Sequence, residues 1–176
     1  MQKEEFLRKF MVHKNKMYRF ARSYISDDEE AKDVVQDVLL KLWETAATLN
    51  EVKNTEAWCM ALVRNKSLDR LKRAERKLRS VGDYSSAEAN AVSAEPAPDR
   101  RLSNKELGEM IQNSAAALPE KQRAAFHLRD VEGYSYLEIS ETLEMDMNQV
   151  KVNIFRARKA LREALTNRIS DERRPA

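Results

Sequence analysis

A polar stretch over residues 82–101 divides the chain into two parts. Its sequence, GDYSSAEANAVSAEPAPDRR, consists mainly of Ala, Ser, Pro and Glu and has almost no large aliphatic residue. Such a segment cannot bury enough apolar surface to offset the entropy lost on folding, so we expect a flexible linker. Strong helix formers with helical spacing of apolar residues lie on both sides. The sequence therefore predicts an all-α protein with two small helical domains, over 1–80 and 102–170, joined by a linker over 81–101.

Glycine and the residue types of catalytic sites are scarce. Only three glycines occur in 176 residues, whereas phosphate-binding loops need several close together so that the backbone can approach the anion. The single cysteine, Cys59, fits a core position, and His13 and His127 lie in different halves. No CxxC or HExxH spacing occurs. We expect no enzyme activity, no cofactor and no metal site.

Local charge is more informative than the total. The net charge is only +3, which argues weakly for a nucleic-acid partner. No apolar run has the length of a signal peptide or of a membrane span, and a single cysteine cannot form an internal disulfide. We therefore expect a cytoplasmic protein without direct membrane insertion, and we look for clusters of charge on particular helices.

Capping residues predict where several helices begin. Ser26 with Glu29 forms a capping-box pattern ahead of a helix over 31–49, and Asn54 suits the cap of a helix that runs towards Leu78. Two further capping boxes, Ser135 with Glu138 and Asp146 with Gln149, are separated by a short helix and a very short connection. This spacing predicts a helix-turn-helix.

The helix after Ser26 carries an aliphatic residue on its polar side. Five residues form the stripe expected to be buried: Val34, Val35, Val38, Leu39 and Leu42. Leu40 points the opposite way, among Asp33, Gln36 and Asp37. An isolated exposed leucine is one interpretation. A docking face for another protein, with Leu40 as its anchor, is the other, and periodicity leaves both open.

The next helix changes along its length from apolar to basic. Trp58 and Leu62 share a stripe with Asn65, and many cations follow. The candidate DNA-binding set is Asn65, Lys66, Arg70, Lys72, Arg73 and Arg76. Lysine and arginine bind phosphates without sequence preference, and a carboxamide can contact a base edge. A solvated helix end is the alternative, but the number of cations favours nucleic acid.

The helix that begins near Met147 is acid-free up to Arg162. Four residues form its predicted buried stripe: Val150, Ile154, Ala157 and Leu161. The opposite side combines cations, amides and exposed apolar groups, as a helix in a DNA major groove requires. The candidate set is Gln149, Lys151, Val152, Asn153, Phe155 and Arg156. In the alternative, Phe155 packs on a neighbouring helix and the cations are ordinary surface.

These segments together resemble the extracytoplasmic-function (ECF) sigma factors, small bacterial initiation factors of the sigma-70 family. The resemblance rests on DDEEAKDVVQDVLLKLW (27–43), NTEAWCMALVRNKSLDRLKR (54–73) and residues 118–165. These segments are similar to the family's core-polymerase-binding, -10-element and -35-element segments respectively. The order of the three, with a polar linker before the last, makes the resemblance specific.

The resemblance implies a partner for each unexplained face. Asp33, Gln36, Asp37 and Leu40 would dock on the clamp helices of the largest subunit of core RNA polymerase. Asn65 and the cations after it would bind the -10 element, including its single-stranded non-template strand, and the loop over 47–53 would capture a flipped base. The -35 element, as double-stranded DNA, would be bound by Lys151, Val152, Asn153, Phe155 and Arg156. The family also implies an anti-sigma factor, often membrane-bound, that would hold the chain inactive.

Two departures from the family pattern limit what carries over. Many members have Gly-Thr-Val-Lys-Ser-Arg at the start of the recognition helix, where this chain has NQVKVN over 148–153, and Glu144 stands where glycine is common. The recognised promoter sequence therefore does not carry over. The alternative to a sigma factor is a dimeric helix-turn-helix regulator with an N-terminal helical sensor domain, which explains neither the basic helix nor the acidic face.

Overall fold

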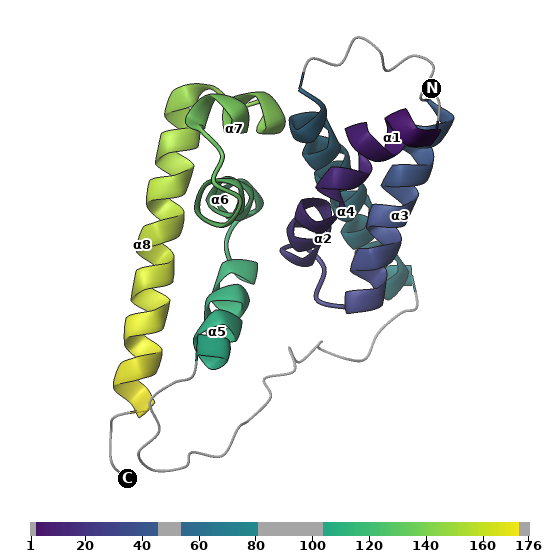
Figure 1. The fold of residues 1–176 in the computed structure, drawn as a ribbon. Coiled ribbons are helices and arrows are strands. Elements are labelled where there is room, and N and C mark those ends of the chain that lie inside the picture. The colour runs from purple at the N-terminus through teal and green to yellow at the C-terminus, as the bar shows by residue number, and fades with distance from the viewer. Residues whose placement is uncertain (1–2, 46–53, 81–103, 173–176) are drawn as a thin grey trace.

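The computed structural model describes residues 3–45, 54–80 and 104–172, and these residues are helical without any strand (Figure 1). The first half contains α1 (Lys3–Lys9), the short turn η1 (Met11–His13), α2 (Lys14–Arg22), α3 (Asp28–Glu44) and α4 (Thr55–Ser80). The second half contains α5 (Asn104–Ala116), α6 (Glu120–Phe126), the π-helical turn η3 (His127–Val131), α7 (Tyr136–Leu143) and α8 (Met147–Glu172). The all-α prediction is confirmed, whereas the predicted linker lies outside the described residues.

Helix α3 has its cap one residue later than the sequence predicts. Asp27, and not Ser26, is the N-cap, and its carboxylate accepts a hydrogen bond from the Glu30 amide at 2.7 Å. The Arg22 guanidinium donates to the backbone oxygens of Ile25 and Ser26, so these residues remain outside the helix. The helix ends at Glu44 and not at Leu49, and residues 46–53, with the predicted base-capturing loop, lie outside the described residues.

The other predicted caps are confirmed. Asn54 Oδ1 accepts from the Ala57 amide at 3.0 Å and starts α4. Ser135 and Glu138 form a reciprocal capping box, as do Asp146 and Gln149, so α7 and α8 begin where the sequence predicts. Because these caps involve residues three apart, they form independently of the rest of the fold.

Helices α7 and α8 form the helix-turn-helix through a tight, left-handed connection. Glu144 has φ of 52°, a conformation that glycine adopts without the Cβ clash of other residues. The connection turns the chain so that Ile139 and Leu143 of α7 pack in the same core as Val150 and Ile154 of α8. The turn therefore fixes the angle at which α8 leaves the domain.

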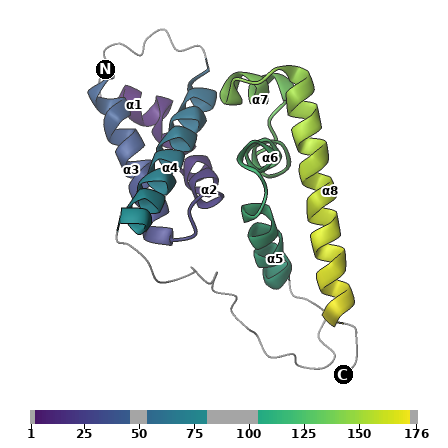
Figure 2. The same ribbon diagram turned by 180° about the vertical axis from the view of Figure 1, so that it is seen from behind.

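The two halves pack against each other across a seam between α2 and α4 on one side and α6, η3 and α7 on the other (Figures 1 and 2). The buried core continues from Phe20 of α2 to residues such as Leu128 of η3. The rings of Phe20 and His127 lie 5.2 Å apart. The sequence gives no basis for predicting this arrangement, because it depends on contacts between residues about a hundred positions apart.

Candidate nucleic-acid and polymerase-binding surfaces

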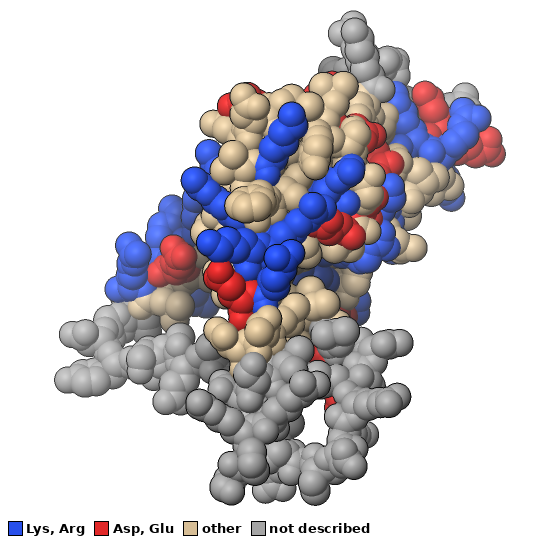
Figure 3. All heavy atoms as spheres, turned by 90° about the vertical axis from the view of Figure 1, so that its left-hand side faces the viewer, with Lys and Arg blue, Asp and Glu red and all other residues tan. Residues whose placement is uncertain are grey.

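The outer face of α8 is exposed to solvent. The predicted buried stripe is confirmed: Val150, Ile154, Ala157 and Leu161 are all buried. On the opposite side, Val152 is 43% and Phe155 69% exposed, so Phe155 does not pack on a neighbouring helix. Lysine and arginine side chains gather around uncharged groups on the side of the molecule where α8 lies (Figure 3). The face thus offers both cations and apolar groups to solvent.

Hydrogen bonds sort the six candidates on α8 into two groups. Gln149 accepts from the Asp146 amide at 3.3 Å, and Asn153 Nδ2 donates to the Gln149 carbonyl at 2.8 Å. Each of these two side chains therefore already has one polar atom in a local hydrogen bond at the start of α8. Lys151, Val152, Phe155 and Arg156 are exposed and, within the part of the chain that the structure describes, neither cation forms an ion pair. These four are free to contact a ligand.

Arg158 orients α8 from the other side. Its guanidinium forms two hydrogen bonds with the Asp130 carboxylate of η3, at 2.6 and 3.0 Å. A bidentate pair of this kind fixes direction as well as distance. Sequence reasoning missed the role of Arg158. Periodicity identifies neighbours on the same helix, whereas the partner of Arg158, Asp130, lies on a different helix.

The exposed face of α3 has a larger apolar area than the sequence suggested. Leu40 is 61% exposed, as predicted, and Trp43, one turn further on, is 46% exposed. The Trp43 ring packs edge-on against Phe6 of α1 at 5.1 Å, so it is held in place although it faces solvent. Asp33 and Gln36 are exposed beside them. Trp43 was missed, although its spacing of three from Leu40 is a signal for the same side of a helix.

Asp37, the fourth candidate on α3, does not face solvent freely. Its Oδ2 atom lies 2.9 Å from Lys66 Nζ and 3.0 Å from Arg70 Nη2, both on α4. Hydrogen bonds from Lys66, and to a lesser extent from Arg70, hold the pKa of this carboxyl below its usual range. The structure therefore joins a candidate polymerase-binding residue to two candidate DNA-binding residues.

The remaining candidates on α4 follow the predicted change from apolar to polar. Asn65 is exposed, and Trp58 and Leu62 on the same stripe are half-buried and pack on the core. Beyond it, Lys72, Arg73 and Arg76 are exposed. Arg64, in contrast, turns towards the seam and binds Glu120 of α6 at 2.7 and 3.1 Å. The exposed cations thus begin about two turns after Asn65.

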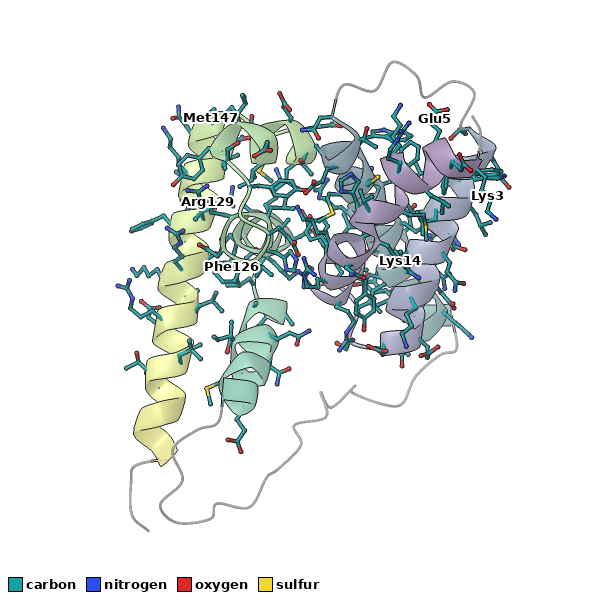
Figure 4. The ribbon with its side chains drawn as sticks, in the orientation of Figure 1. Lys3, Glu5, Lys14, Phe126, Arg129 and Met147 are labelled. Carbon is teal, nitrogen blue, oxygen red and sulfur yellow. The ribbon has the colours of Figure 1, made fainter. Side chains whose placement is uncertain are left out.

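Side chains of the two halves meet along the seam (Figure 4), and three carboxylates form hydrogen bonds across it. The side chain of Glu132 is 1% exposed; it accepts hydrogen bonds from Arg19 at 2.6 and 2.9 Å and lies 3.2 Å from His127 Nε2. Burial alone would raise the pKa of Glu132, but hydrogen bonds from His127 and Arg19 lower it to about 2. Glu120 binds Arg64 and accepts from Tyr24, and Glu56 accepts from the Tyr134 hydroxyl at 2.7 Å.

Metal-ligating side chains do not cluster among the described residues. No group of three or more His, Cys, Asp and Glu side chains lies close enough together to hold a metal ion in these ranges. Cys59 is buried, and burial raises the pKa of its thiol to about 12. None of the described helices is long and apolar enough to cross a membrane.

Comparison with known proteins agrees with this geometry. Residues 10–77 match the family described as Sigma-70 region 2, and residues 108–161 match Sigma-70, region 4. The chain is 28% identical over 161 residues to the ECF RNA polymerase sigma factor SigE of Mycolicibacterium smegmatis, covering 90% of this chain and 61% of that protein. It is 23% identical over 159 residues to ECF sigma factor SigW of Bacillus subtilis, covering 88% and 85% respectively.

A solved structure shows the same fold. The sigma factor RpoE of Bartonella quintana, crystallised with the anti-sigma factor NepR, is 24% identical with a TM-score of 0.73, covering 93% of this chain and 98% of that one. Region 2 covers α2 to α4 in the first half of the structure, and region 4 covers α5 to α8 in the second half. The chain belongs to the sigma-70 family, within its extracytoplasmic-function group.

Proposed function

We propose that the chain is a transcription initiation factor that binds core RNA polymerase and directs it to promoters. The observation that carries this proposal is the outer face of α8, where Val152, Phe155, Lys151 and Arg156 are exposed on an acid-free surface. A solvated helix without a ligand would bury Phe155 or intersperse acids among the cations. The activity is binding, with no covalent step.

Helix α8 contacts the -35 element through its exposed side chains. Lys151 and Arg156 neutralise phosphates or donate to base edges, and Val152 and Phe155 make apolar contacts such as those with thymine methyl groups. Arg158, tied to Asp130, orients the helix in the groove. Gln149 and Asn153 each use one polar atom in a local hydrogen bond, so the Gln149 NH2 group and the Asn153 Oδ1 atom are what they offer to bases.

Helix α4 contacts the -10 element. Asn65 lies at the point where its stripe changes from apolar to polar, and Lys72, Arg73 and Arg76 extend the cationic surface beyond it. These cations bind the DNA backbone, and Asn65 offers a donor and an acceptor to one base. The loop over 47–53 receives a flipped base, which is a role taken from the family.

Helix α3 docks on core RNA polymerase. Leu40 and Trp43 supply exposed apolar area, and Asp33, Gln36 and Asp37 supply acceptors around it. An apolar centre with a polar rim is the usual composition of a binding hot spot. The acidic rim selects a partner with basic groups.

Both promoter elements can be occupied together only if the seam opens. The -10 and -35 elements are roughly 25 base pairs apart, or about 85 Å of B-form DNA. The longest of the described helices, α4 and α8, have 26 residues each and span about 39 Å at the usual rise per residue. In the closed arrangement α4 and α8 both pack against α7 and so lie close together, whereas the predicted linker over 81–101 could reach roughly 70 Å when extended. Separation of the halves is therefore part of the mechanism.

An anti-sigma factor is the expected regulator. RpoE of Bartonella quintana, which shares the fold of this chain, was crystallised with the anti-sigma factor NepR. For this chain, the exposed face of α3 is the surface that such an inhibitor would cover to prevent polymerase docking. The protein acts in the cytoplasm, where an anti-sigma factor in the membrane could hold it.

Co-elution with core polymerase tests the proposed function. The full chain is mixed with purified core enzyme and separated by size, and we expect it to elute with the enzyme. Leu40→Asp places a charge at the centre of the docking face and should abolish co-elution, whereas Leu78→Asp alters a similarly exposed leucine of α4 and should not. Failure of the unmodified chain to co-elute would favour the alternative, a dimeric helix-turn-helix regulator, whose dimer the same column would detect.

A further inference from the structure

One carboxylate oxygen lies between two cations that are expected to bind DNA. Lys66 and Arg70 are one turn apart on α4, and both contact Oδ2 of Asp37 on α3, at 2.9 and 3.0 Å. All three side chains remain about one third exposed, at 34% for Lys66, 29% for Arg70 and 36% for Asp37. The pair of cations is therefore accessible from solvent and is not part of the core.

The geometry of this pair suits a phosphate. An ammonium and a guanidinium that converge on a single anionic oxygen can bind one non-bridging oxygen of a DNA backbone in the same way. Asp37 satisfies the guanidinium only in part, because Nε of Arg70 is buried and has no hydrogen-bond partner among the described residues. Asp37 thus occupies the place of a phosphate without using every donor.

The position of Asp37 on α3 connects this site with polymerase docking. Asp37 lies one turn before Leu40, which is the exposed centre of the proposed docking face. A basic group of a docked partner would compete with Lys66 and Arg70 for the same carboxylate. Because partly exposed ion pairs are weak, such a competitor can displace them.

We propose that Lys66 and Arg70 form a binding site for one backbone phosphate, that Asp37 occupies it in the free protein, and that docking on polymerase withdraws Asp37 and opens it. The inference rests on the proposed function for its last step only. By thermodynamic linkage, DNA bound at this site also strengthens docking by the same factor. The chain therefore binds DNA through α4 more tightly after it has joined the polymerase.

The first experiment measures DNA binding by the free, full-length chain. The variant Lys151→Ala/Arg156→Ala serves as background, so that α8 contributes little, and the probe is a short single-stranded oligonucleotide of mixed sequence. We expect Asp37→Asn to bind about 2- to 5-fold more tightly, since it removes a weak competitor. The dependence of log affinity on log salt should steepen by roughly 0.7 for the phosphate gained.

A matched control separates this effect from a change in net charge. Glu44→Gln removes one negative charge from the same face of α3, two turns further on, where the side chain is exposed. It should give a smaller gain and leave the salt slope unchanged. In a Lys66→Ala/Arg70→Ala chain the gain from Asp37→Asn should disappear. An equal gain from Glu44→Gln, or a gain that persists without the two cations, would overturn the site.

A second experiment tests the coupling with polymerase. At saturating core enzyme, the unmodified chain and Asp37→Asn should bind the oligonucleotide with affinities that differ by less than about 1.5-fold, because docking has already withdrawn Asp37. A difference as large as in the free proteins would contradict the coupling. Failure of the unmodified chain to co-elute with polymerase would instead contradict the proposed function, and the first experiment does not depend on it.

Discussion

The outer face of α8 and the surface of α4 carry similar charge but differ in what surrounds it. On α8, Lys151 and Arg156 face solvent without an ion pair among the described residues. On α4, Arg64 is bound to Glu120, and Lys66 and Arg70 are bound to Asp37. The cations of α8 are therefore accessible to DNA, whereas Arg64, Lys66 and Arg70 of α4 must first leave their carboxylate partners.

This difference shows why the number of cations is a poor measure of DNA affinity. When a cation that already has an ion-pair partner binds DNA, the net free energy is that of the phosphate contact minus that of the ion pair it gives up. The net charge of +3 conceals the contrast completely. The paired surface can be regulated by whatever competes for its acids, whereas the unpaired surface responds mainly to salt.

The largest expected effect concerns the paired side of the molecule. Glu132→Gln should lower the free energy of unfolding by about 3 kcal/mol, the lower end of the range for a broken buried pair, because Arg19 is 47% exposed. Urea denaturation measures the change. Asp130→Asn, which breaks a pair between more exposed side chains in the second half, should cost less than about 1 kcal/mol. Equal losses of stability from the two variants would mean that the Arg19–Glu132 pair stabilises the fold no more than the exposed Arg158–Asp130 pair does.

The same carboxylate makes stability depend on pH. The pKa of Glu132 is lowered from 4.5 to about 2, so its contribution is present above pH 4.5 and is lost as the pH falls towards 2. The unmodified chain should therefore lose more stability than Glu132→Gln in this window. Urea midpoints measured across it provide the test, and parallel curves for the two proteins would contradict the assignment.

On the unpaired side, Arg156→Ala should weaken binding to a cognate -35 duplex by about 2 kcal/mol, or roughly 30-fold. Arg70→Ala should weaken binding to a -10 oligonucleotide less, because Arg70 must first leave Asp37. Fluorescence anisotropy measures both. Arg162→Ala, an exposed change on the same helix as Arg156, serves as the control. A greater loss of DNA affinity from Arg70→Ala than from Arg156→Ala would contradict the distinction between cations with and without an ion-pair partner.

A smaller effect is expected for the exposed end of α4. Lys72→Ala should reduce the salt slope of single-strand binding by roughly 0.7, since an exposed cation releases one counterion equivalent for each phosphate. Lys66→Ala should reduce it less in the free protein, where Asp37 competes. Titrations at several salt concentrations measure the slopes. Identical slopes for both variants would remove the distinction between paired and unpaired cations.

The smallest effect concerns the turn before α8. Glu144 has φ of 52°. Glu144→Gly should raise the free energy of unfolding by about 0.5–1 kcal/mol, because it removes the steric clash between Cβ and the backbone in this conformation. Thermal denaturation measures the gain. Because α8 keeps its direction, affinity for duplex DNA should not change. A loss of stability would show that the Glu144 side chain has another role.

Local patterns were predictable from the sequence because their causes are local. The buried stripe of α8 follows from spacing by three and four, and the caps at Asn54, Ser135 and Asp146 involve residues three apart. The cap of α3 was wrong because Arg22, which holds Ile25 and Ser26 out of the helix, lies outside the capping pattern. Short-range rules fail where a more distant residue supplies the deciding hydrogen bond.

The contacts that decide which cations are free were not predictable. Asp37 and Arg70 are 33 positions apart, and Arg19 and Glu132 are 113 positions apart, so their meeting depends on how whole helices pack. Nothing in the sequence of α4 distinguishes Arg64, in the seam, from Lys72, in solvent. Sequence patterns therefore indicated the residue types of the candidate surfaces, while the structure supplied their partners.

Run-off transcription with core polymerase on a promoter library tests the proposed function most directly. We expect the full chain to direct transcripts from a subset of promoters that share a -10 and a -35 sequence, and Arg156→Ala to change the preferred -35 bases. If the chain gave no transcripts beyond those of core enzyme alone, it would not be acting as an initiation factor.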